Sequence, residues 1–340
     1  MNRTEAPSAP FGAAGTAPVA EIGLVIYPDC QLSAVHGLTD LFRIAGEWSG
    51  RPAREIRVSH WRVAGDGLQP EWDSHTGAGA HRLSHVILPP SLVMPGRMAA
   101  QPGTAQWLRD RHAEGATLCS VCAGAFVLAE TGLMEGRRAT THWAFAEALA
   151  RRHPGIRLAE EHMVLDDGDI VTAGGILAWT DLGLTLVERL LGPSTMLATA
   201  RFLLIEPPRS SQRPFAPFVP RFDHGDEPVR RAQHHLHARS AEPLSVGELQ
   251  AVAGLTERTF LRRFTAATGH RPNDYLQQVR IARAREALES SHSPVDRIAW
   301  DVGYGDVAAF RKSFQKLTGM APGLYRQTFG IGPTRRAEDV

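Results

Sequence analysis

Residues 260–275 read FLRRFTAATGHRPNDY, and residues 310–325 repeat the pattern as FRKSFQKLTGMAPGLY. The identical positions are all aromatic, Thr, Gly or Pro, and in the first copy they are Phe260, Phe264, Thr268, Gly269, Pro272 and Tyr275. Because these residue types determine packing and turns, the repeat indicates one supersecondary unit used twice. Duplex DNA also repeats with each helical turn, so it is a suitable target for two such units.

Each copy predicts two short helices joined by a tight turn. In the first copy, Ser245 and Thr256 are suitable residues to begin two consecutive helices, and Gly254 and Gly269 are suitable residues to end them. The second copy repeats this arrangement from Ser293 onward. Two helices joined in this way form a helix-turn-helix, so the second helix of each copy is a candidate for the major groove of DNA.

A third helix is expected between the copies, over residues 273–290, with a length of roughly 25 Å. A helix of this length would hold the two units about one turn of DNA apart. Arg258, Arg262 and Arg263 lie in the second helix of the first copy, and Lys312 takes the position of Arg262 in the other. An arginine on such a helix can bind guanine or hold a phosphate, although charged helix faces are also commonly just solvated.

Three stretches, LSVGELQAVAGLTERTFLRRF, RIARAREALE and IAWDVGYGDVAAFRKSFQKLTGMAPGLYR, resemble the DNA-binding domain of AraC-type transcription regulators over residues 228–329. The resemblance implies an all-α domain with two helix-turn-helix units, a double-stranded DNA operator and RNA polymerase as partners. The positions that it places against base edges are Glu257, Arg258, Leu261 and Arg262 in the first unit and Val307, Ala308, Ala309 and Lys312 in the second. The apolar residues of the second unit predict that sequence reading depends mainly on the first.

Composition predicts a two-domain globular protein. The 340 residues are 43% hydrophobic and 21% charged, with a net charge of +1. No apolar run is long enough for a membrane span or a secretion signal, so a cytoplasmic protein without membrane contact is expected. A proline-rich stretch at 193–227 predicts a linker between a domain at 21–192 and the one at 228–329, with a disordered lead-in at 1–20 and a tail at 330–340.

Strands and helices alternate over residues 21–192. Apolar runs predict strands at 22–27, 56–63, 85–89 and 117–121, and helices are expected at 38–45, 107–114 and 125–131. This alternation favours an α/β domain with a parallel sheet covered by helices on both faces. Ligands of such folds bind at the carboxyl ends of the strands.

One of those strand ends carries Cys122, followed by Ala123 and Gly124. The small residues permit the sharp strand-to-helix turn of a nucleophile elbow. A helix N-terminus at the thiol is expected to lower its pKa and favour the thiolate. The stretch, with its CAGAF and TTHW segments, resembles the PfpI-protease and class I glutamine amidotransferase-like superfamily over residues 21–191, and so implies a flavodoxin-like domain. More narrowly, it resembles regulators in which this domain precedes an AraC-type unit.

Active members of that superfamily pair the elbow cysteine with an acid and often with a histidine. Here Ala34 falls at the acidic position, and only His36 and His142 remain as candidate partners. We therefore expect a sensor or dimerisation domain without catalysis or a cofactor, in a homodimer that responds to a small, nitrogen-containing effector. Candidate residues of the ligand pocket are Cys122, Ala123, Gly124, His36 and His142. The alternative is an amidase or hydrolase that uses Cys122 and carries an accessory DNA-binding domain.

Two patterns suggest metal sites only weakly. Cys119 and Cys122 form a C-x-x-C, and residues 234–237 read HHLH, but no second pair of ligands follows at metal spacing. We expect Cys119 to be a buried apolar filler, the histidines to pack or lie on the surface, and no metal to bind. Four tryptophans could form an aromatic wall for a cationic amine or belong to the core: Trp61, Trp72, Trp143 and Trp179.

Overall fold

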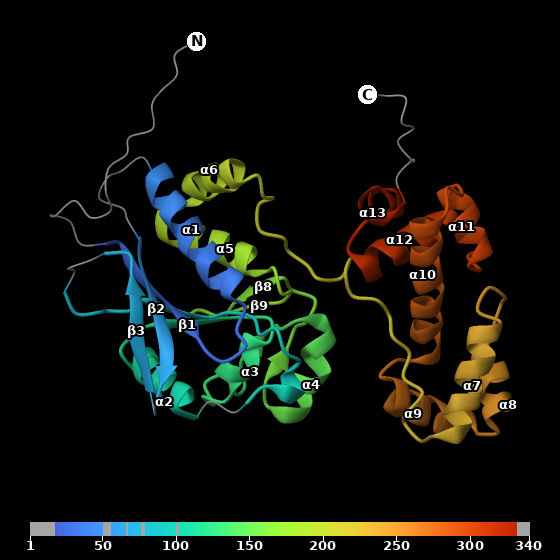
Figure 1. Cartoon of the computed structure of the whole chain (residues 1–340). Helices are drawn as coiled ribbons and strands as arrows, with labels where there is room; N and C mark the ends of the chain where they lie inside the picture. The colour runs from blue at the N-terminus through green and yellow to red at the C-terminus, as the bar shows by residue number, and fades with distance from the viewer. Residues whose placement is uncertain (1–17, 50–55, 66, 76–78, 100–101, 332–340) are drawn as a thin grey trace, which may run out of the picture. The chain divides into compact units, whose positions relative to one another are not determined.

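The computed structural model describes residues 18–49, 56–65, 67–75, 79–99 and 102–331, and these form two compact units that divide between Gln212 and Arg213 (Figure 1). Most of the lead-in predicted at 1–20 and of the tail predicted at 330–340 lies outside the described residues.

The first unit is built on a seven-stranded sheet with the order β3-β2-β1-β4-β5-β9-β8. The strands are β1 (Ala20–Ile26), β2 (Ile56–Ala64), β3 (Gly67–Asp73), β4 (His85–Leu88), β5 (Thr117–Val121), β8 (Val164–Asp166) and β9 (Ile170–Ala173). The five central strands are parallel, as predicted, whereas β3 and β8 pair antiparallel at the two edges. These edge strands were not predicted, because β3 is mostly exposed and β8 has only three residues.

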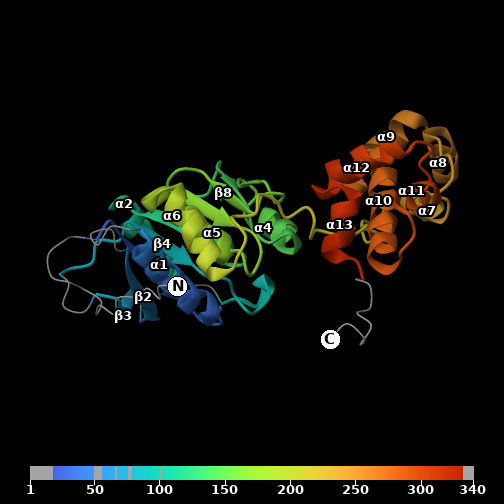
Figure 2. The same cartoon turned by 90° about the horizontal axis from the view of Figure 1, so that it is seen from above.

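Helices cover both faces of this sheet (Figures 1 and 2). One face carries α1 (Leu32–Trp48), α5 (Trp179–Leu191) and α6 (Pro193–Leu203). The other carries α2 (Pro102–Ala113), α3 (Gly124–Ala129) and α4 (Ala146–Arg152). Short elements complete the unit: β6 (Arg138–Ala139), β7 (Arg157–Leu158) and two 3-10 turns at Pro95–Arg97 and Trp143–Phe145. This is the flavodoxin-like α/β architecture that the sequence predicts.

The structure differs from the linker predicted at 193–227. Pro193 does not extend the chain; it occupies the first turn of α6, where its fixed φ suits a helix and no backbone donor is lost. Helix α6 packs on α1 and α5, so the first unit continues beyond residue 192 to Gln212. Pro207 and Pro208 also belong to the first unit, and the other prolines of the predicted linker lie in the second unit, which begins at Arg213.

The second unit is entirely helical. Its helices are α7 (Glu227–Ala238), α8 (Val246–Ala253), α9 (Glu257–Thr268), α10 (Pro272–Ser290), α11 (Val295–Asp301), α12 (Val307–Thr318) and α13 (Pro322–Phe329). The pairs α8–α9 and α11–α12 are the two predicted helix-turn-helix units. Ser245 begins α8, and its hydroxyl accepts a hydrogen bond from the Glu248 amide at 3.1 Å.

The repeated residues make the same contacts in both copies. Gly269 and Gly319 end α9 and α12 with φ of 76° and 77°, a left-handed conformation that glycine adopts without strain. The Thr268 hydroxyl donates to the Phe264 carbonyl at 2.7 Å, and Thr318 repeats this bond to Phe314 at 2.8 Å. The sequence repeat is therefore a repeat of turn geometry and not only of residue types.

Each copy has a separate hydrophobic core, and α10 supplies both. Its first half contributes Tyr275, Leu276 and Val279 to the core of the first copy. Its second half contributes residues such as Ala284 and Leu288 to the other core. The helix thus sets the spacing of the two units, as the sequence predicted.

Candidate functional site

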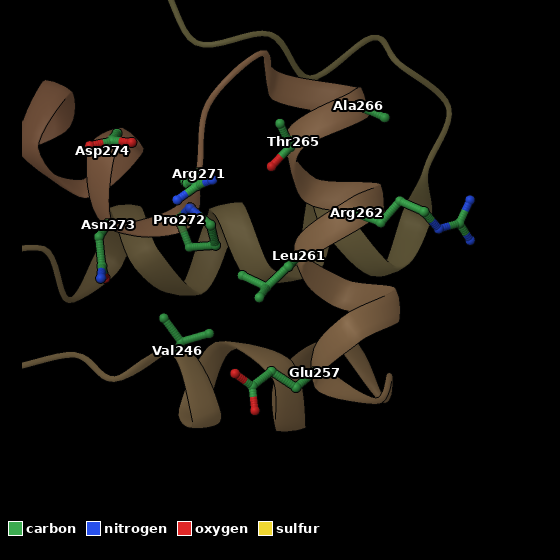
Figure 3. Close-up of a pocket in the computed structure, with 10 residues that line it drawn as sticks. All are labelled: Val246, Glu257, Leu261, Arg262, Thr265, Ala266, Arg271, Pro272, Asn273 and Asp274. Atoms are coloured by element: carbon green, nitrogen blue, oxygen red, sulfur yellow. The ribbon is translucent and has the colours of Figure 1, made fainter.

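Helix α9 carries the four positions of the first unit that the resemblance places against base edges. Glu257, Arg258 and Arg262 are exposed, and Leu261 is half-buried. Glu257, Leu261 and Arg262 all line a hollow of about 960 Å³, and the Arg262 side chain points in a different direction from that of Leu261 (Figure 3). The four positions that the resemblance identifies thus lie together on the first half of α9.

Ion pairs separate the basic residues of the helix-turn-helix units into two groups. The Arg263 guanidinium donates to the Asp226 carboxylate at 2.7 and 2.8 Å, which ties α9 to the start of α7, and this pairing raises the pKa of Arg263. Arg311 likewise pairs with Asp296 at 2.8 Å. Within the part of the chain that the structure describes, Arg258, Arg262, Lys312 and Lys316 have no acidic partner. Arg263, which lies in the same helix as Arg258 and Arg262, is held against α7.

Helix α12 offers less polar surface at its start. Ala308 and Ala309 are exposed, Val307 is half-buried, and Lys312 is exposed one turn later. The Asp306 carboxylate accepts from the Ala308 and Ala309 amides at 3.2 and 2.8 Å, as its predicted role as an N-cap requires. The first turn of α12 therefore combines small side chains with an N-terminus that is capped by Asp306.

The start of α10 is a surface that the sequence analysis missed. Arg271, Asn273 and Asp274 line the same hollow as Glu257 and Leu261 (Figure 3). Pro272 is buried at the first turn of α10 and fixes the path of the chain there. The repeated proline could have indicated this surface in the sequence, because it marks the start of the helix that follows the recognition helix.

In the first unit, Cys122 forms the predicted sharp turn between β5 and α3. Its φ is 55°, a left-handed conformation that is strained for a residue with a side chain. Its amide donates to the Ala173 carbonyl at 2.8 Å and so continues the sheet ladder. Two residues later, only glycine fits at position 124, because a Cβ there would lie 2.5 Å from the Leu88 carbonyl oxygen.

The expectation that the helix N-terminus lowers the pKa of Cys122 is wrong. Burial raises the pKa of Cys122 to about 12, and the hydrogen bond from the Ala123 amide opposes this shift only in part. Only 1% of the residue is exposed. The helix that follows has six residues, and loss of solvation outweighs the stabilisation that its N-terminus gives the charged form. The thiol is therefore neutral at ordinary pH.

Neither predicted histidine partner pairs with this thiol among the described residues. His36 is exposed, and its ring lies 5.6 Å from the ring of His60. The His142 Nδ1 accepts from the Ala144 amide at 3.1 Å, and burial lowers the pKa of that imidazole. Ala34 is fully buried and supplies no acid.

The ionisable neighbours of the elbow are instead Tyr27 and Cys30, which follow β1. The Tyr27 hydroxyl donates to the Pro89 carbonyl at 2.5 Å. Burial raises the pKa of Tyr27 well above its usual value, and the nearby Cys30 and Cys122 thiols add to the shift. The raised pKa values of Tyr27, Cys30 and Cys122 favour the neutral form of all three groups.

The weaker metal patterns have structural explanations. Cys119 is fully buried as a free thiol inside β5. His234 stacks on Phe222, His235 lies 3.0 Å from a Glu248 oxygen, and the His237 Nε2 lies 3.0 Å from the Tyr275 hydroxyl. Across the described ranges no cluster of three or more His, Cys, Asp or Glu could hold a metal ion.

The tryptophans do not form a common wall. Trp61 packs on Trp107, Trp72 on His60 and Trp143 on His142. Trp179 lies against Gly37, where an added Cβ would come within 2.5 Å of its ring. In the described ranges, no helix is both long and apolar enough to cross a bilayer.

Comparisons with known proteins agree with this division of the chain. A helix-turn-helix domain model matches residues 249–328, and a DJ-1/PfpI family model matches residues 77–189. The regulator CdhR of Pseudomonas aeruginosa is 28% identical over 66% of this chain and 67% of its own length. The regulator GlxA of Rhizobium meliloti is 26% identical over 92% of this chain and 97% of its own length.

An enzyme also matches, but over a smaller part of both chains. An isonitrile hydratase of Pseudomonas putida is 36% identical over 110 residues, which are 32% of this chain and 47% of the enzyme. GlxA, in contrast, is matched over 97% of its own length and is a regulator. The chain therefore carries a DJ-1/PfpI domain followed by an AraC-type helix-turn-helix domain, and its relatives CdhR and GlxA are HTH-type transcriptional regulators.

Proposed function

We propose that this regulator reads a two-part site on double-stranded DNA with α9 and α12, and that its first unit senses a small molecule. The observation that carries the DNA-binding proposal is the distribution of ion pairs on the duplicated scaffold. Arg263 and Arg311 are neutralised by carboxylates, whereas Arg258, Arg262 and Lys312 are exposed and have no acidic partner among the described residues. Unpaired cations on a recognition helix are available for phosphates and base edges.

The chemistry of each position suggests what it reads. Arg258 and Arg262 suit guanine edges or phosphates, and Glu257 suits the amino group of cytosine. Leu261 suits a thymine methyl group, as do the small residues Val307, Ala308 and Ala309 of the second unit. Lys312 is a point charge that suits a phosphate. We therefore assign base discrimination mainly to the first unit, and phosphate anchoring with methyl contacts to the second.

The sensor assignment depends on the neutral elbow. The raised pKa of Cys122 disfavours the thiolate, and among the described residues neither His36, His142 nor Ala34 supplies the partner that nucleophilic catalysis requires. Cys122, Ala123 and Gly124 at the strand end, with His36 and His142 as further candidates, would then bind a small, nitrogen-containing effector. A homodimer in the cytoplasm that contacts RNA polymerase completes this proposal. The alternative, an amidase or hydrolase that uses Cys122, is supported by the similarity to the isonitrile hydratase.

The first experiment selects duplexes that bind the full chain from a random pool and then measures two matched variants. Arg262→Ala should lose about 1–3 kcal/mol of affinity for the selected duplex and relax its base preference. Arg297→Ala on α11 removes the same charge from an exposed arginine that is paired with Asp301, and it should have little effect. Equal losses in both variants would contradict the role of Arg262.

A second experiment separates sensor from enzyme. Cys122→Ala should keep the affinity of the wild-type chain for the selected duplex, because the thiol belongs to the other unit. The wild-type chain should show no hydrolysis of amides and no hydration of isonitriles above background. Turnover that disappears in Cys122→Ala would instead support the enzymatic alternative.

A further inference from the structure

The proline-rich segment at the start of the second unit runs along α10 as a strap, formed by residues 214–222 (Figure 1). Its prolines recur at every third position, at Pro214, Pro217 and Pro220. Each proline fixes its own φ, and this spacing favours a polyproline II conformation, in which side chains three residues apart share one edge at a separation of about 9 Å. Phe215 and Phe218 have this spacing. The segment is therefore a stiff rod that carries two aromatic rings.

The beginning of the strap is bound to the second copy. The Arg285 guanidinium on α10 donates at 2.5 and 2.6 Å to two carbonyls of the strap, those of Pro214 and Ala216. It also donates to the Tyr325 hydroxyl at 2.8 Å and lies 5.2 Å from the centre of that ring. The Phe215 ring packs edge-on against Phe329 of α13, with 5.4 Å between the ring centroids. One arginine thus joins the strap to the repeated tyrosine of the second copy.

The next part of the strap is bound to the first copy. The Phe218 ring lies edge-on to Tyr275, 5.2 Å away, and packs against the core of that copy. The buried Gln233 amide on α7 donates at 2.9 Å both to the Arg221 carbonyl and to the Tyr275 hydroxyl. Only Pro217 separates the last carbonyl that Arg285 holds from Phe218. A short, stiff span therefore connects the repeated tyrosines of two separate cores.

A second bridge joins the copies on another side of α10. The Arg280 guanidinium donates to the Ser240 and Glu242 carbonyls, in the loop after α7, at 2.7 and 2.9 Å. It also lies 5.7 Å from the centre of the Tyr304 ring, which belongs to the core of the second copy. Arg280 and Arg285 are five residues apart, which places them about 140° apart around the helix. The two bridges therefore restrain bending of α10 in different directions.

We propose that the strap is a positioning element of the DNA-binding unit, which fixes the angle and distance between α9 and α12. The two cores share α10, and a long helix curves, so contacts along its sides decide how its ends are oriented. One base pair added between the two parts of a DNA site moves the second part by about 3.4 Å and rotates it by about 35°. A strapped unit rejects this change, whereas a slack one adapts to it. This consequence for DNA rests on the proposed function.

Two insertions into the full chain separate positioning from packing. Gly-Ser-Gly-Ser between Ala216 and Pro217 adds about 11 Å of flexible chain inside the span and removes no side chain. The same insertion between Pro220 and Arg221 lengthens the segment equally but leaves the span from Pro214 to Phe218 unchanged. Neither insertion removes a packed group, so both chains should keep the wild-type melting temperature.

The first measurement needs no DNA. Spin labels at Thr265→Cys and Gln315→Cys, exposed and equivalent positions on α9 and α12, report the distance between these helices by pulsed electron paramagnetic resonance. The three native cysteines are buried, so the labels attach to the introduced ones. The insertion after Ala216 should broaden the distance distribution to at least about twice its wild-type width, because the span becomes slack. The insertion after Pro220 should keep the wild-type width.

The second measurement uses the duplex selected with the wild-type chain and duplexes with one base pair added or removed between its two parts. The wild-type chain and the insertion after Pro220 should lose at least about tenfold in affinity on the altered duplexes, and the insertion after Ala216 about threefold or less. An unbroadened distance distribution, equal losses in both insertions, or a wild-type chain that tolerates the altered spacing would overturn the strap while DNA binding stands. If the wild-type chain selects no duplex, the proposed function fails, and the distance distribution alone decides whether the strap positions the two helices.

Discussion

Cys122 should resist alkylation in the folded chain, and the structure gives the size of the effect. A pKa of about 12 leaves roughly one thiol in ten thousand as thiolate at pH 8, whereas an ordinary cysteine with a pKa of about 8.5 is about one-quarter ionised. Because the thiolate is the reacting species, iodoacetamide should modify the folded chain at least about a thousandfold more slowly than a free cysteine. Burial of all but 1% of the residue acts in the same direction.

The assay follows alkylation of the peptide that contains Cys122 by mass spectrometry, at pH 8, with the urea-unfolded chain as reference. Cys30 and Cys119 are also buried with raised pKa values, so all three thiols should react together as the chain unfolds. The raised pKa of Cys122 stabilises the fold below about pH 8.5, and this contribution is lost as the pH rises toward 12. Alkylation of folded Cys122 within tenfold of the unfolded rate would refute the buried, neutral elbow.

Three further outcomes are expected. Burial lowers the pKa values of His60 and His85 to about 4. Each neutral histidine therefore contributes up to about 3 kcal/mol of stability, which is complete above pH 6.5 and is lost as the pH falls toward 4. Urea titrations should show the free energy of unfolding falling over this pH range, and His60→Gln should make that fall smaller. Arg280→Met should lower the free energy of unfolding by about 3 kcal/mol, measured by thermal or urea unfolding, because two main-chain carbonyls lose the buried guanidinium that donates to them. Arg283→Met, at an exposed position, should lower it less. Gly124→Ala should destabilise the first unit by about 1–3 kcal/mol, since its Cβ would meet a backbone oxygen at 2.5 Å, and an unchanged melting temperature would contradict that geometry.

The second unit was the more predictable of the two. Its helices begin and end at residues whose type determines the local geometry, such as Ser245, Asp306 and Gly269. Those signals act over three or four positions and are visible in the sequence. The pairing of Arg263 with Asp226 was not predictable, because it joins residues 37 positions apart.

The elbow could be located but not characterised from the sequence. The small residues after Cys122 predicted the turn, although the contact that excludes a side chain at Gly124 is with the Leu88 carbonyl of another strand. The pKa of the thiol depends on how completely the rest of the unit excludes water, which the residues beside it do not reveal. The same limit applies to Arg285, whose two carbonyl partners in the strap lie 69 and 71 positions away in the chain.

Helix α10 leaves no place to divide the DNA-binding region into separately stable halves. A fragment that ended before residue 272 would leave Phe260 and Phe264 without Tyr275, and one that began after residue 290 would leave Phe314 without Leu288. Either fragment would expose the apolar side of its recognition helix to water and is expected to aggregate. Gene truncations or domain swaps in this region should therefore exchange α10 whole, together with both copies, and insertions are best tolerated at its ends.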